Sequence, residues 1–355
     1  MFSDLTKPYI IAGPCSAESA EQMDTVAATL SQNSNIKLLR AGIWKPRTRP
    51  NNFEGVGEPG LKWLVDAGKK HHLKTTTEIA NAVHVEKALK AGIDVLWIGA
   101  RTTVNPFSVQ EIADAVKGTN VPVMVKNPIT PDLDLWVGAI ERIQGAGIQN
   151  IAAIHRGFSS YEKTKYRNDP KWGIPVNLMQ IFPDLQIICD PSHIGGTRDL
   201  IQPIAQKALD MNMAGLMIET HPTPDLALSD AKQQITPDRL LDILVNLAVR
   251  KQTPKTGTDY ELDDLRQQID AVDDDILATL LKRFDIIDAI GRYKKDHHLT
   301  ILHVERWTEI FNSRTIKGIE KGLSRDFIET VVKAIHKESV HRQTDILNFQ
   351  NNKLD

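Results

Sequence analysis

A regular alternation of two patterns over the first 250 residues constrains the fold of this chain most strongly. Eight short apolar runs alternate with longer stretches whose apolar residues recur every three or four positions. The short runs predict strands and the periodic stretches predict helices. The predicted strands are Tyr9–Ala12, Lys37–Ile43, Lys74–Glu78, Val95–Gly99, Val121–Lys126, Ile151–His155, Gln186–Cys189 and Leu216–Glu219. Eight β/α units predict a TIM (β/α)8 barrel over residues 1–250. A doubly wound open sheet is the alternative, but no GxGxxG sequence follows the first strand to support it.

The pattern changes after a polar stretch, Lys251–Thr258, which holds one Pro and one Gly. That composition is typical of a linker. From Asp259 to about Lys295, apolar residues recur every three or four positions, which predicts a helix roughly 50 Å long. Two shorter helices are predicted near Val304–Lys317 and Ser324–Leu347. Because one long helix cannot bury its apolar stripe alone, we predict an all-helical second domain over residues 259–355.

The composition excludes several classes of protein. A formal net charge of −2 gives no reason to expect affinity for nucleic acid or a membrane surface. The two cysteines, Cys15 and Cys189, argue against a disulfide framework and for a reducing compartment. No apolar run reaches the length of about 18 residues that a membrane span needs. We therefore expect a cytoplasmic protein that acts on small molecules.

Potential metal ligands stand at the ends of three predicted strands. His193, Glu219 and Asp230 lie in two segments where a short apolar run leads into polar residues, and Cys15 has a similar setting. Ligands at the carboxyl ends of parallel strands can converge on one point. Imidazole, carboxylate and thiolate together suit a first-row divalent ion such as Mn, Fe, Co or Zn. We expect these four residues to bind one such ion.

Cationic side chains gather at the same strand ends. Surface lysines such as Lys69, Lys70 and Lys87 instead fall on predicted helices. The carboxyl ends of the strands form the catalytic face of a TIM barrel. The placement therefore predicts that these cations line a site. They are Arg40, Lys45, Arg101, Lys126 and Arg156.

Seven motifs in a fixed order resemble those of the short-barrel 3-deoxy-D-arabino-heptulosonate 7-phosphate (DAHP) synthases. They are GPCS at 13–16, KPRT at 45–48, GAR at 99–101, VKN at 125–127, HRG at 155–157, DPSH at 190–193 and the IETHP…LSD segment that ends at 230. The resemblance implies condensation of phosphoenolpyruvate with erythrose 4-phosphate, the first step of the shikimate pathway. It implies that Arg40, Lys45, Arg101, Lys126 and Arg156 bind phosphoenolpyruvate, and that Arg47 and Thr48 bind the phosphate of erythrose 4-phosphate. It also implies that Cys15, His193, Glu219 and Asp230 bind the metal.

The resemblance further implies that Lys45 donates a proton to the new alkoxide, while Asp230 or a metal-bound water manages the other proton. One related family is the alternative. The octulosonate-phosphate (KDO8P) synthases share the barrel and its chemistry but use arabinose 5-phosphate. They usually carry Asn at the position of Pro46, so the sequence here favours the four-carbon aldose. The residues after Thr48, Arg49–Asn51, depart from the commoner Thr-Ser continuation.

Residues 259–350 resemble the all-helical chorismate mutases. Arg283 and Lys294 are eleven residues apart, only about 20° around a helix, so they can face one site. Arg266 points about a quarter-turn away and, in that family, reaches the partner's site in an intertwined dimer. The residues at the family's binding positions are Arg266, Arg283, Lys294, Arg306 and Gln343. The resemblance implies that Lys294 and Gln343 hydrogen-bond the ether oxygen of chorismate during its rearrangement to prephenate. It also implies a homo-oligomer, at least a dimer.

Two positions depart from the mutase pattern. Trp307 stands where the family usually has a carboxylate, and His303 where it usually has Asp. Both positions contact the hydroxyl region of the substrate in that family. The alternative is therefore a C-terminal domain that only binds chorismate or prephenate for regulation and dimerisation. We hypothesise that prephenate, bound to the helical domain, inhibits the barrel.

Overall fold

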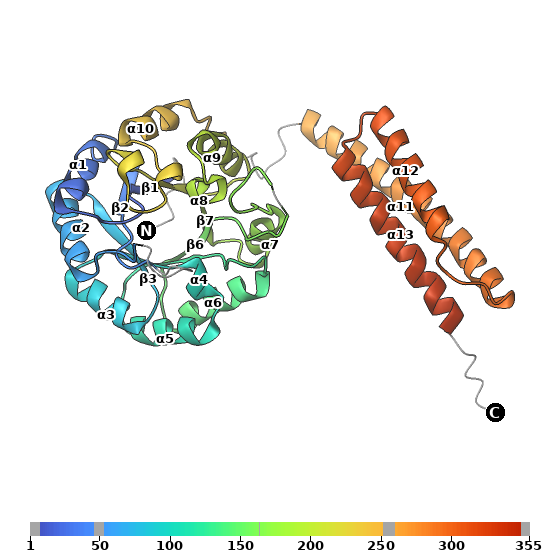
Figure 1. The fold of residues 1–355 in the computed structure, drawn as a ribbon, viewed down its shortest axis with the longest axis horizontal. Helices are drawn as coiled ribbons and strands as arrows, with labels where there is room; N and C mark the ends of the chain where they lie inside the picture. Colours follow the sequence, from blue (N-terminus) through green and yellow to red (C-terminus); the bar gives the residue numbers. More distant parts are fainter. Residues whose placement is uncertain (1–7, 46–52, 163, 251–259, 349–355) are drawn as a thin grey trace. The chain divides into compact units, whose positions relative to one another are not determined.

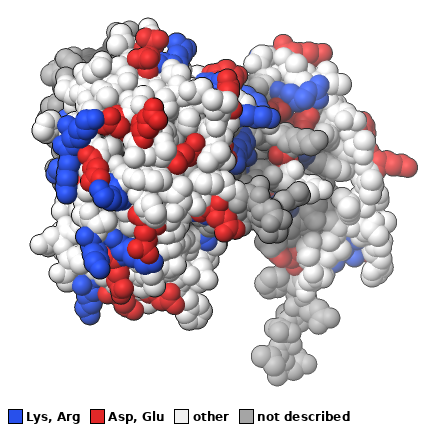
Figure 2. All heavy atoms as spheres, turned by 60° about the vertical axis from the view of Figure 1, so that its left-hand side comes forward, with Lys and Arg blue, Asp and Glu red and all other residues white. Residues whose placement is uncertain are grey.

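The computed structural model describes residues 8–45, 53–162, 164–250 and 260–348 (Figure 1). By its internal contacts the chain separates into two compact units, Met1–Gln252 and Thr253–Asp355. The predicted linker, Lys251–Thr258, lies outside the described residues, and so do Arg47 and Thr48. On the face of the molecule that Figure 2 shows, basic and acidic side chains are interspersed, in keeping with the formal net charge of −2.

Eight parallel strands close into a barrel in chain order, as the sequence predicted (Figure 1). They are β1 (Tyr9–Gly13), β2 (Ile36–Arg40), β3 (Lys74–Ile79), β4 (Val95–Ile98), β5 (Val123–Lys126), β6 (Ile151–His155), β7 (Gln186–Cys189) and β8 (Gly215–Glu219). The first strand pairs with both β2 and β8, which leaves the sheet without an edge. All eight carboxyl ends therefore face the same end of the barrel.

Helices surround the strands (Figure 1). The longer ones are α1 (Ala20–Leu30), α2 (Glu58–Lys70), α3 (Ala82–Ala91), α5 (Pro106–Val116), α6 (Leu133–Gly145), α7 (Gly173–Ile181), α9 (Ile201–Asp210) and α10 (Pro237–Asn246). Polar side chains cap several of them: Ser19, Asn81 and Asp132 each accept a backbone N–H from the first turn. The sequence did not predict α7 or the short helices α4 (Ala100–Thr103) and α8 (Pro191–Gly195). With four and five residues, α4 and α8 are too short to show a helical period.

Alternation along the strands divides the barrel core into two parts. Residues that point outward, such as Leu96 and Ile98, pack under the helices. Residues that point inward fill the barrel: Ile11, Leu38, Val95, Trp97, Met124, Ala152, Ile154, Ile188 and Met217. On five strands the second residue after an inward apolar side chain is charged, namely Arg40, Lys126, Arg156, Asp190 and Glu219. The period of two therefore sets a charged layer directly above an apolar floor.

The second unit is all helical, as the sequence predicted. It comprises α11 (Tyr260–Asp296), α12 (Val304–Glu320) and α13 (Arg325–Asn348). The last helix packs against both α11 and α12. Much of the apolar stripe of α11 remains exposed, including Ile269 at 60% and Leu281 at 65%. None of the described helices is long and apolar enough to cross a membrane.

Candidate active sites

Two buried ion pairs lie in the charged layer of the barrel. Arg40, only 1% exposed, places Nη2 3.0 Å from Oε1 of Glu219. Lys126 donates a 2.8 Å hydrogen bond to Oδ2 of Asp190. The Nε and Nη1 atoms of Arg40 are buried and have no hydrogen-bond partner among the described residues. Since a buried donor without a partner is costly, these two nitrogens point to an anionic ligand.

Further cations crowd the same layer. Arg156 is held by Asn127, whose Oδ1 accepts its backbone N–H at 2.7 Å, and by Asn168, whose Oδ1 accepts from Nη1 at 2.7 Å. Burial, together with the positive charges of Arg167 and Arg101, lowers the pKa of Arg156 to about 10. A ligand that carries more than one negative charge would offset the repulsion among these cations.

Lys45 lies against Cys15, in the loop that follows β1. Its Nζ donates to the carbonyl oxygen of Cys15 at 2.8 Å and lies 3.0 Å from Sγ. Gly42 makes this approach possible, because a Cβ there would lie 2.6 Å from the Cys15 carbonyl oxygen. Burial lowers the pKa of Lys45, but the interaction with the Cys15 sulfur and the negative charge of Glu219 outweigh it and raise that pKa overall. Lys45 therefore carries a positive charge at neutral pH.

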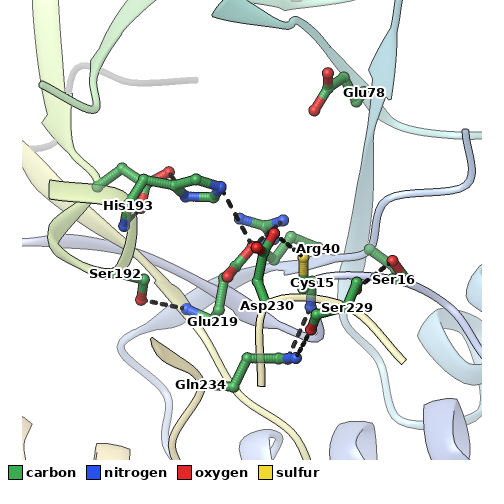
Figure 3. Close-up of polar contacts among 12 residues, drawn as sticks. Cys15, Ser16, Arg40, Glu78, Ser192, His193, Glu219, Ser229, Asp230 and Gln234 are labelled. Carbon is green, nitrogen blue, oxygen red and sulfur yellow. Dashed lines mark hydrogen bonds and ion pairs between the residues drawn. The ribbon is translucent and has the colours of Figure 1, made fainter. Parts of the chain in front are cut away.

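The four predicted metal ligands point toward one another (Figure 3). The Cys15 thiol lies 3.3 Å from Oδ2 of Asp230, and Nε2 of His193 lies 3.7 Å from Oε1 of Glu219. On the other side of the imidazole ring, Nδ1 contacts Oδ2 of Asp190 at 2.8 Å. A carboxylate on Nδ1 leaves Nε2 as the nitrogen available to a metal, an arrangement common in metalloproteins.

As they stand, no three His, Cys, Asp or Glu side chains of the described residues are close enough to hold a metal ion. The chemistry of the donor set nevertheless fits a first-row divalent ion. Burial and the charge of Glu219 raise the pKa of the Cys15 thiol to about 12. A bound cation would favour the thiolate instead.

Asp230, the fourth predicted metal ligand, has a strained backbone conformation. Asp230 has φ 48° and ψ 37°, a left-handed conformation that costs free energy in a residue other than Gly. Several contacts fix its loop. Nη1 of Arg167 lies 3.0 Å from Oδ1 of Asp230 and also donates to Gln233, whose side chain donates to Glu219 at 2.7 Å. Burial raises the pKa of Asp230, but Arg167 and His193 outweigh it, so that pKa lies well below its usual range.

The same loop is also fixed to the first strand (Figure 3). The hydroxyls of Ser16 and Ser229 are 2.6 Å apart, and the backbone N–H of Cys15 donates to Oε1 of Gln234 at 2.9 Å. The sequence predicted no role for Ser16, Ser229, Gln234 or Arg167. They lie in loops without a period, and the only available signals were the place of Ser16 beside Cys15 in the GPCS motif and that of Ser229 beside Asp230 in the LSD motif.

In the helical unit, a polar cluster joins α11 to α13. Arg283 donates from Nη1 to Oγ of Ser339 at 2.7 Å. Gln343, which is 6% exposed, donates to the Ser339 carbonyl oxygen at 3.0 Å, and its Oε1 has no partner among the described residues. Burial, then the charge of Arg314, lowers the pKa of Arg283. The structure thus brings two predicted mutase residues to one place and adds Ser339.

The other three predicted residues make different contacts. Nζ of Lys294 donates to the carbonyl oxygen of Ile301, just beyond the end of α11. Arg266 pairs with Asp263 and Arg306 with Glu309, both on the exposed surface.

The two departures from the mutase pattern lie at the start of α12. His303 is the residue that precedes the helix. Trp307 stacks on His336 of α13 with ring centroids 3.7 Å apart. Burial and the charge of Arg283 lower the pKa of His336.

Comparisons with known proteins assign both units to families. The DAHP synthetase I family matches residues 4–253, and the Chorismate mutase type II family matches residues 265–344. A phospho-2-dehydro-3-deoxyheptonate aldolase of Thermotoga maritima is 34% identical over 226 residues, which are 64% of this chain and 64% of that protein. The chain therefore spans somewhat less than two thirds of that relative. A 2-dehydro-3-deoxyphosphooctonate aldolase of Dechloromonas aromatica is 25% identical over 279 residues, 72% of this chain and 95% of that protein.

Solved structures agree with the family assignment of the barrel. The crystal structure of a DAHP synthase from Thermotoga maritima matches with a TM-score of 0.61 and 33% identity, over 67% of this chain and 68% of that one. A truncated form of the synthase from the same organism matches with a TM-score of 0.59 and 30% identity, over 67% of this chain and 84% of that one.

Proposed function

This chain belongs to the DAHP synthetase I family, and we propose that its barrel condenses phosphoenolpyruvate with erythrose 4-phosphate to give DAHP. We propose that its helical unit rearranges chorismate to prephenate. On this proposal residues 1–250 carry the synthase and residues 259–355 the mutase. The observation that carries the first activity is the buried guanidinium of Arg40, which keeps two nitrogens without a hydrogen-bond partner among the described residues, in the layer that also holds Lys126 and Arg156.

Phosphoenolpyruvate suits this layer because it carries a phosphate and a carboxylate. Arg binds either group through two parallel hydrogen bonds, whereas Lys acts as a point charge. We assign its binding to Arg40, Lys45, Arg101, Lys126 and Arg156. Arg47 and Thr48 would bind the phosphate of the aldose.

The metal that the family typically uses would be held by Cys15, His193, Glu219 and Asp230, and it would be Mn, Fe, Co or Zn. When bound there, a divalent ion supplies Lewis-acid polarisation of the aldehyde carbonyl. Asp190 orients the imidazole of His193, and Gln233 holds Glu219.

The remaining chemistry falls to side chains of the barrel. C3 of phosphoenolpyruvate attacks the aldehyde carbon, and Nζ of Lys45 donates a proton to the oxygen that becomes the new hydroxyl. Water then adds to C2, and the proton that this water loses passes to Asp230 or to a neighbouring water. The C2 hydroxyl gives its proton to the departing phosphate as the bond between C2 and the phosphate oxygen breaks, which leaves the ketone. One molecule each of phosphoenolpyruvate, aldose and water thus gives DAHP and inorganic phosphate.

Arabinose 5-phosphate is the alternative aldose, because the similar proteins include a 2-dehydro-3-deoxyphosphooctonate aldolase. A coupled assay that follows phosphoenolpyruvate consumption with each aldose, with and without a chelator, separates the two. We expect turnover with erythrose 4-phosphate and none with chelator present. A preference for arabinose 5-phosphate would replace the proposed substrate, and no turnover with either would refute the synthase.

In the helical unit, Lys294 and Gln343 would hydrogen-bond the ether oxygen of chorismate as negative charge develops there. Arg283 and Arg306 would bind its carboxylates, and Arg266 would reach a partner's site. A dimer is supported by the exposed apolar stripe of α11. The alternative, a module that binds the ligand without catalysis, is motivated by Trp307 and His303. A mutase assay on the full chain decides between them.

We also propose that prephenate inhibits the barrel. A ligand in the helical unit can act on the barrel if it has different affinities for two arrangements of the units. Prephenate titrations of the full chain and of a chain truncated after Thr256 test this proposal. We expect inhibition of the full chain alone. Equal inhibition of both, or of neither, would refute it.

A further inference from the structure

One large side chain forms the floor beneath the cation layer. Trp97 lies on β4 and points into the barrel beside Val95 and Met124. It is 0% exposed and is among the largest fully buried side chains of the protein. The interior of a TIM barrel is usually filled by branched aliphatic residues. An indole in this layer therefore suggests a role beyond filling space.

The residue above Trp97 on the same strand is a glycine. On five other strands the residue two positions after the inward apolar side chain is charged, as Arg40 and Glu219 are. A Cβ on Gly99 would lie only 2.1 Å from Oε1 of Glu78. The space over the indole is thus left to side chains from other strands.

Three of those side chains contact the indole. The guanidinium carbon of Arg40 lies 5.0 Å from the ring centroid, and Nζ of Lys126 lies 5.7 Å from it. Both distances are within the range of a cation–π interaction, for which Trp is the strongest aromatic partner. The indole Nε1–H donates to Oε2 of Glu78 at 3.2 Å. One side chain therefore touches two cations and one carboxylate of the same layer.

The contact with the indole of Trp97 constrains the guanidinium of Arg40 in a way that its ion pair with Glu219 does not. Only Nη2 of Arg40 contacts Glu219, while Nε and Nη1 have no hydrogen-bond partner among the described residues. A single contact at one nitrogen does not set the plane of the guanidinium. Contact with an aromatic ring limits the tilt of the plane, and it leaves the edge with Nε and Nη1 available to an anion.

We propose that Trp97 is a positioning residue for phosphoenolpyruvate, holding Arg40 and Lys126 by its ring and Glu78 by its N–H. The proposal rests on the proposed synthase function. Trp97 does not touch the substrate on this account. It sets the orientation of the two cations that do. Its loss therefore weakens the binding of phosphoenolpyruvate more than the binding of the aldose.

The test uses the full chain with its metal and compares W97L, W97F and M217A. Leu removes the ring, whereas Phe keeps a ring but loses the N–H donor. Met217 lies in the same inner cluster, so M217A controls for a cavity in the floor. W97M provides a second non-aromatic variant if W97L does not fold. The dissociation constant of phosphoenolpyruvate is measured by calorimetry, KM for both substrates by the coupled assay, and Tm by thermal unfolding.

We expect W97L or W97M to raise the dissociation constant and KM for phosphoenolpyruvate about tenfold, as loss of cation–π contacts of ordinary strength would do. KM for the aldose should stay within about twofold, and W97F should recover most of the affinity. M217A should lower Tm without changing either KM. The proposal is overturned if both non-aromatic variants bind phosphoenolpyruvate normally, if W97F is as weak as W97L, or if M217A shows the same loss. If the unaltered chain neither binds nor consumes phosphoenolpyruvate, the proposed function itself has failed.

Discussion

The two candidate sites differ in how completely one chain builds them. In the barrel, Arg40, Lys126 and Glu219 are buried and each meets a charged partner or an aromatic ring. In the helical unit, Arg283 and Gln343 meet through Ser339, while Arg266 forms a surface pair with Asp263. The long helix that carries Arg283 keeps apolar side chains exposed along its length.

The difference follows from topology. A closed barrel brings eight strand ends to one face within a single chain, so it can fix a site before any ligand binds. A helix of 37 residues that packs mainly against one shorter helix, α13, lacks enough neighbours to cover its apolar stripe. We therefore expect the barrel site to be complete in one chain and the mutase site to require a second.

Metal removal should separate the two sites most sharply. Exhaustive chelation is expected to abolish DAHP synthesis and leave mutase turnover unchanged, because only the barrel holds the Cys15 and His193 donor set. Mn²⁺ should restore the synthase. Cys15→Ala should lose metal, measured by elemental analysis, while keeping its circular dichroism spectrum. Full synthase activity in a sample verified as metal-free would contradict the assignment.

Replacing a single side chain of the mutase site should reduce mutase activity and spare synthase activity, the opposite of metal removal. Lys294→Ala is expected to reduce mutase turnover by about 10²-fold or more, as removal of one donor to a developing negative charge does. Synthase turnover should change far less. Both rates are measured on the same preparation. An equal fall in both would mean that the substitution damages the structure rather than a catalytic role.

A charge on the exposed stripe of α11 should weaken association. Leu281, which is 65% exposed, would be buried in a dimer, and Leu281→Asp is expected to shift the mass in sedimentation toward a monomer. Mutase activity per chain should fall about tenfold at low concentration, and synthase activity should not. Thr279→Asp, at an exposed position about 160° away around the helix, adds the same single charge and serves as the control. If Leu281→Asp sediments like the unaltered chain, this stripe is not the interface.

The smallest predicted effect is a loss of stability of the barrel at low pH. His155 is fully buried among aromatic rings, and burial together with Arg156 lowers its pKa to about 3. An unfolded His has a pKa of about 6.5, so below that pH the unfolded chain binds a proton that the folded barrel excludes. The free energy of unfolding therefore falls as pH drops from 6.5 toward 3. Between pH 7.5 and 5.5 this residue should account for about 1.4 kcal/mol.

Urea unfolding of the barrel transition at the two pH values checks this. His155→Phe fits the aromatic surroundings and should lose less stability on acidification than the unaltered chain. An identical loss in both proteins would show that His155 does not exclude the proton.

Sequence periodicity predicted the barrel and the strand-end side chains, because a period of two fixes both the inward face and the residue above it. It could not predict Arg167 or the contact of Ser16 with Ser229. These residues lie in irregular loops, and only the closed fold brings them within reach. Trp97 was hidden for another reason: within an apolar run an indole is indistinguishable from a core residue until the cations above it are placed.

The site roles of Arg266 and Arg306 remain predictions, because their proposed partners would lie in another chain or on a bound substrate. A single chain places both in surface ion pairs. The exposed stripe on α11 could be foreseen from the length of the helix, whereas its partner could not.

The most direct test of the contrast between the sites is complementation between two inactive variants, Arg266→Ala and Lys294→Ala, produced by co-expression. In a mixed dimer, one mutase site would combine an intact Lys294 from one chain with an intact Arg266 from the other. If chains pair at random, mutase activity should return to about a quarter of the unaltered level, while synthase activity stays at its full value throughout. Mutase activity no higher than that of either variant alone would contradict a site shared between chains.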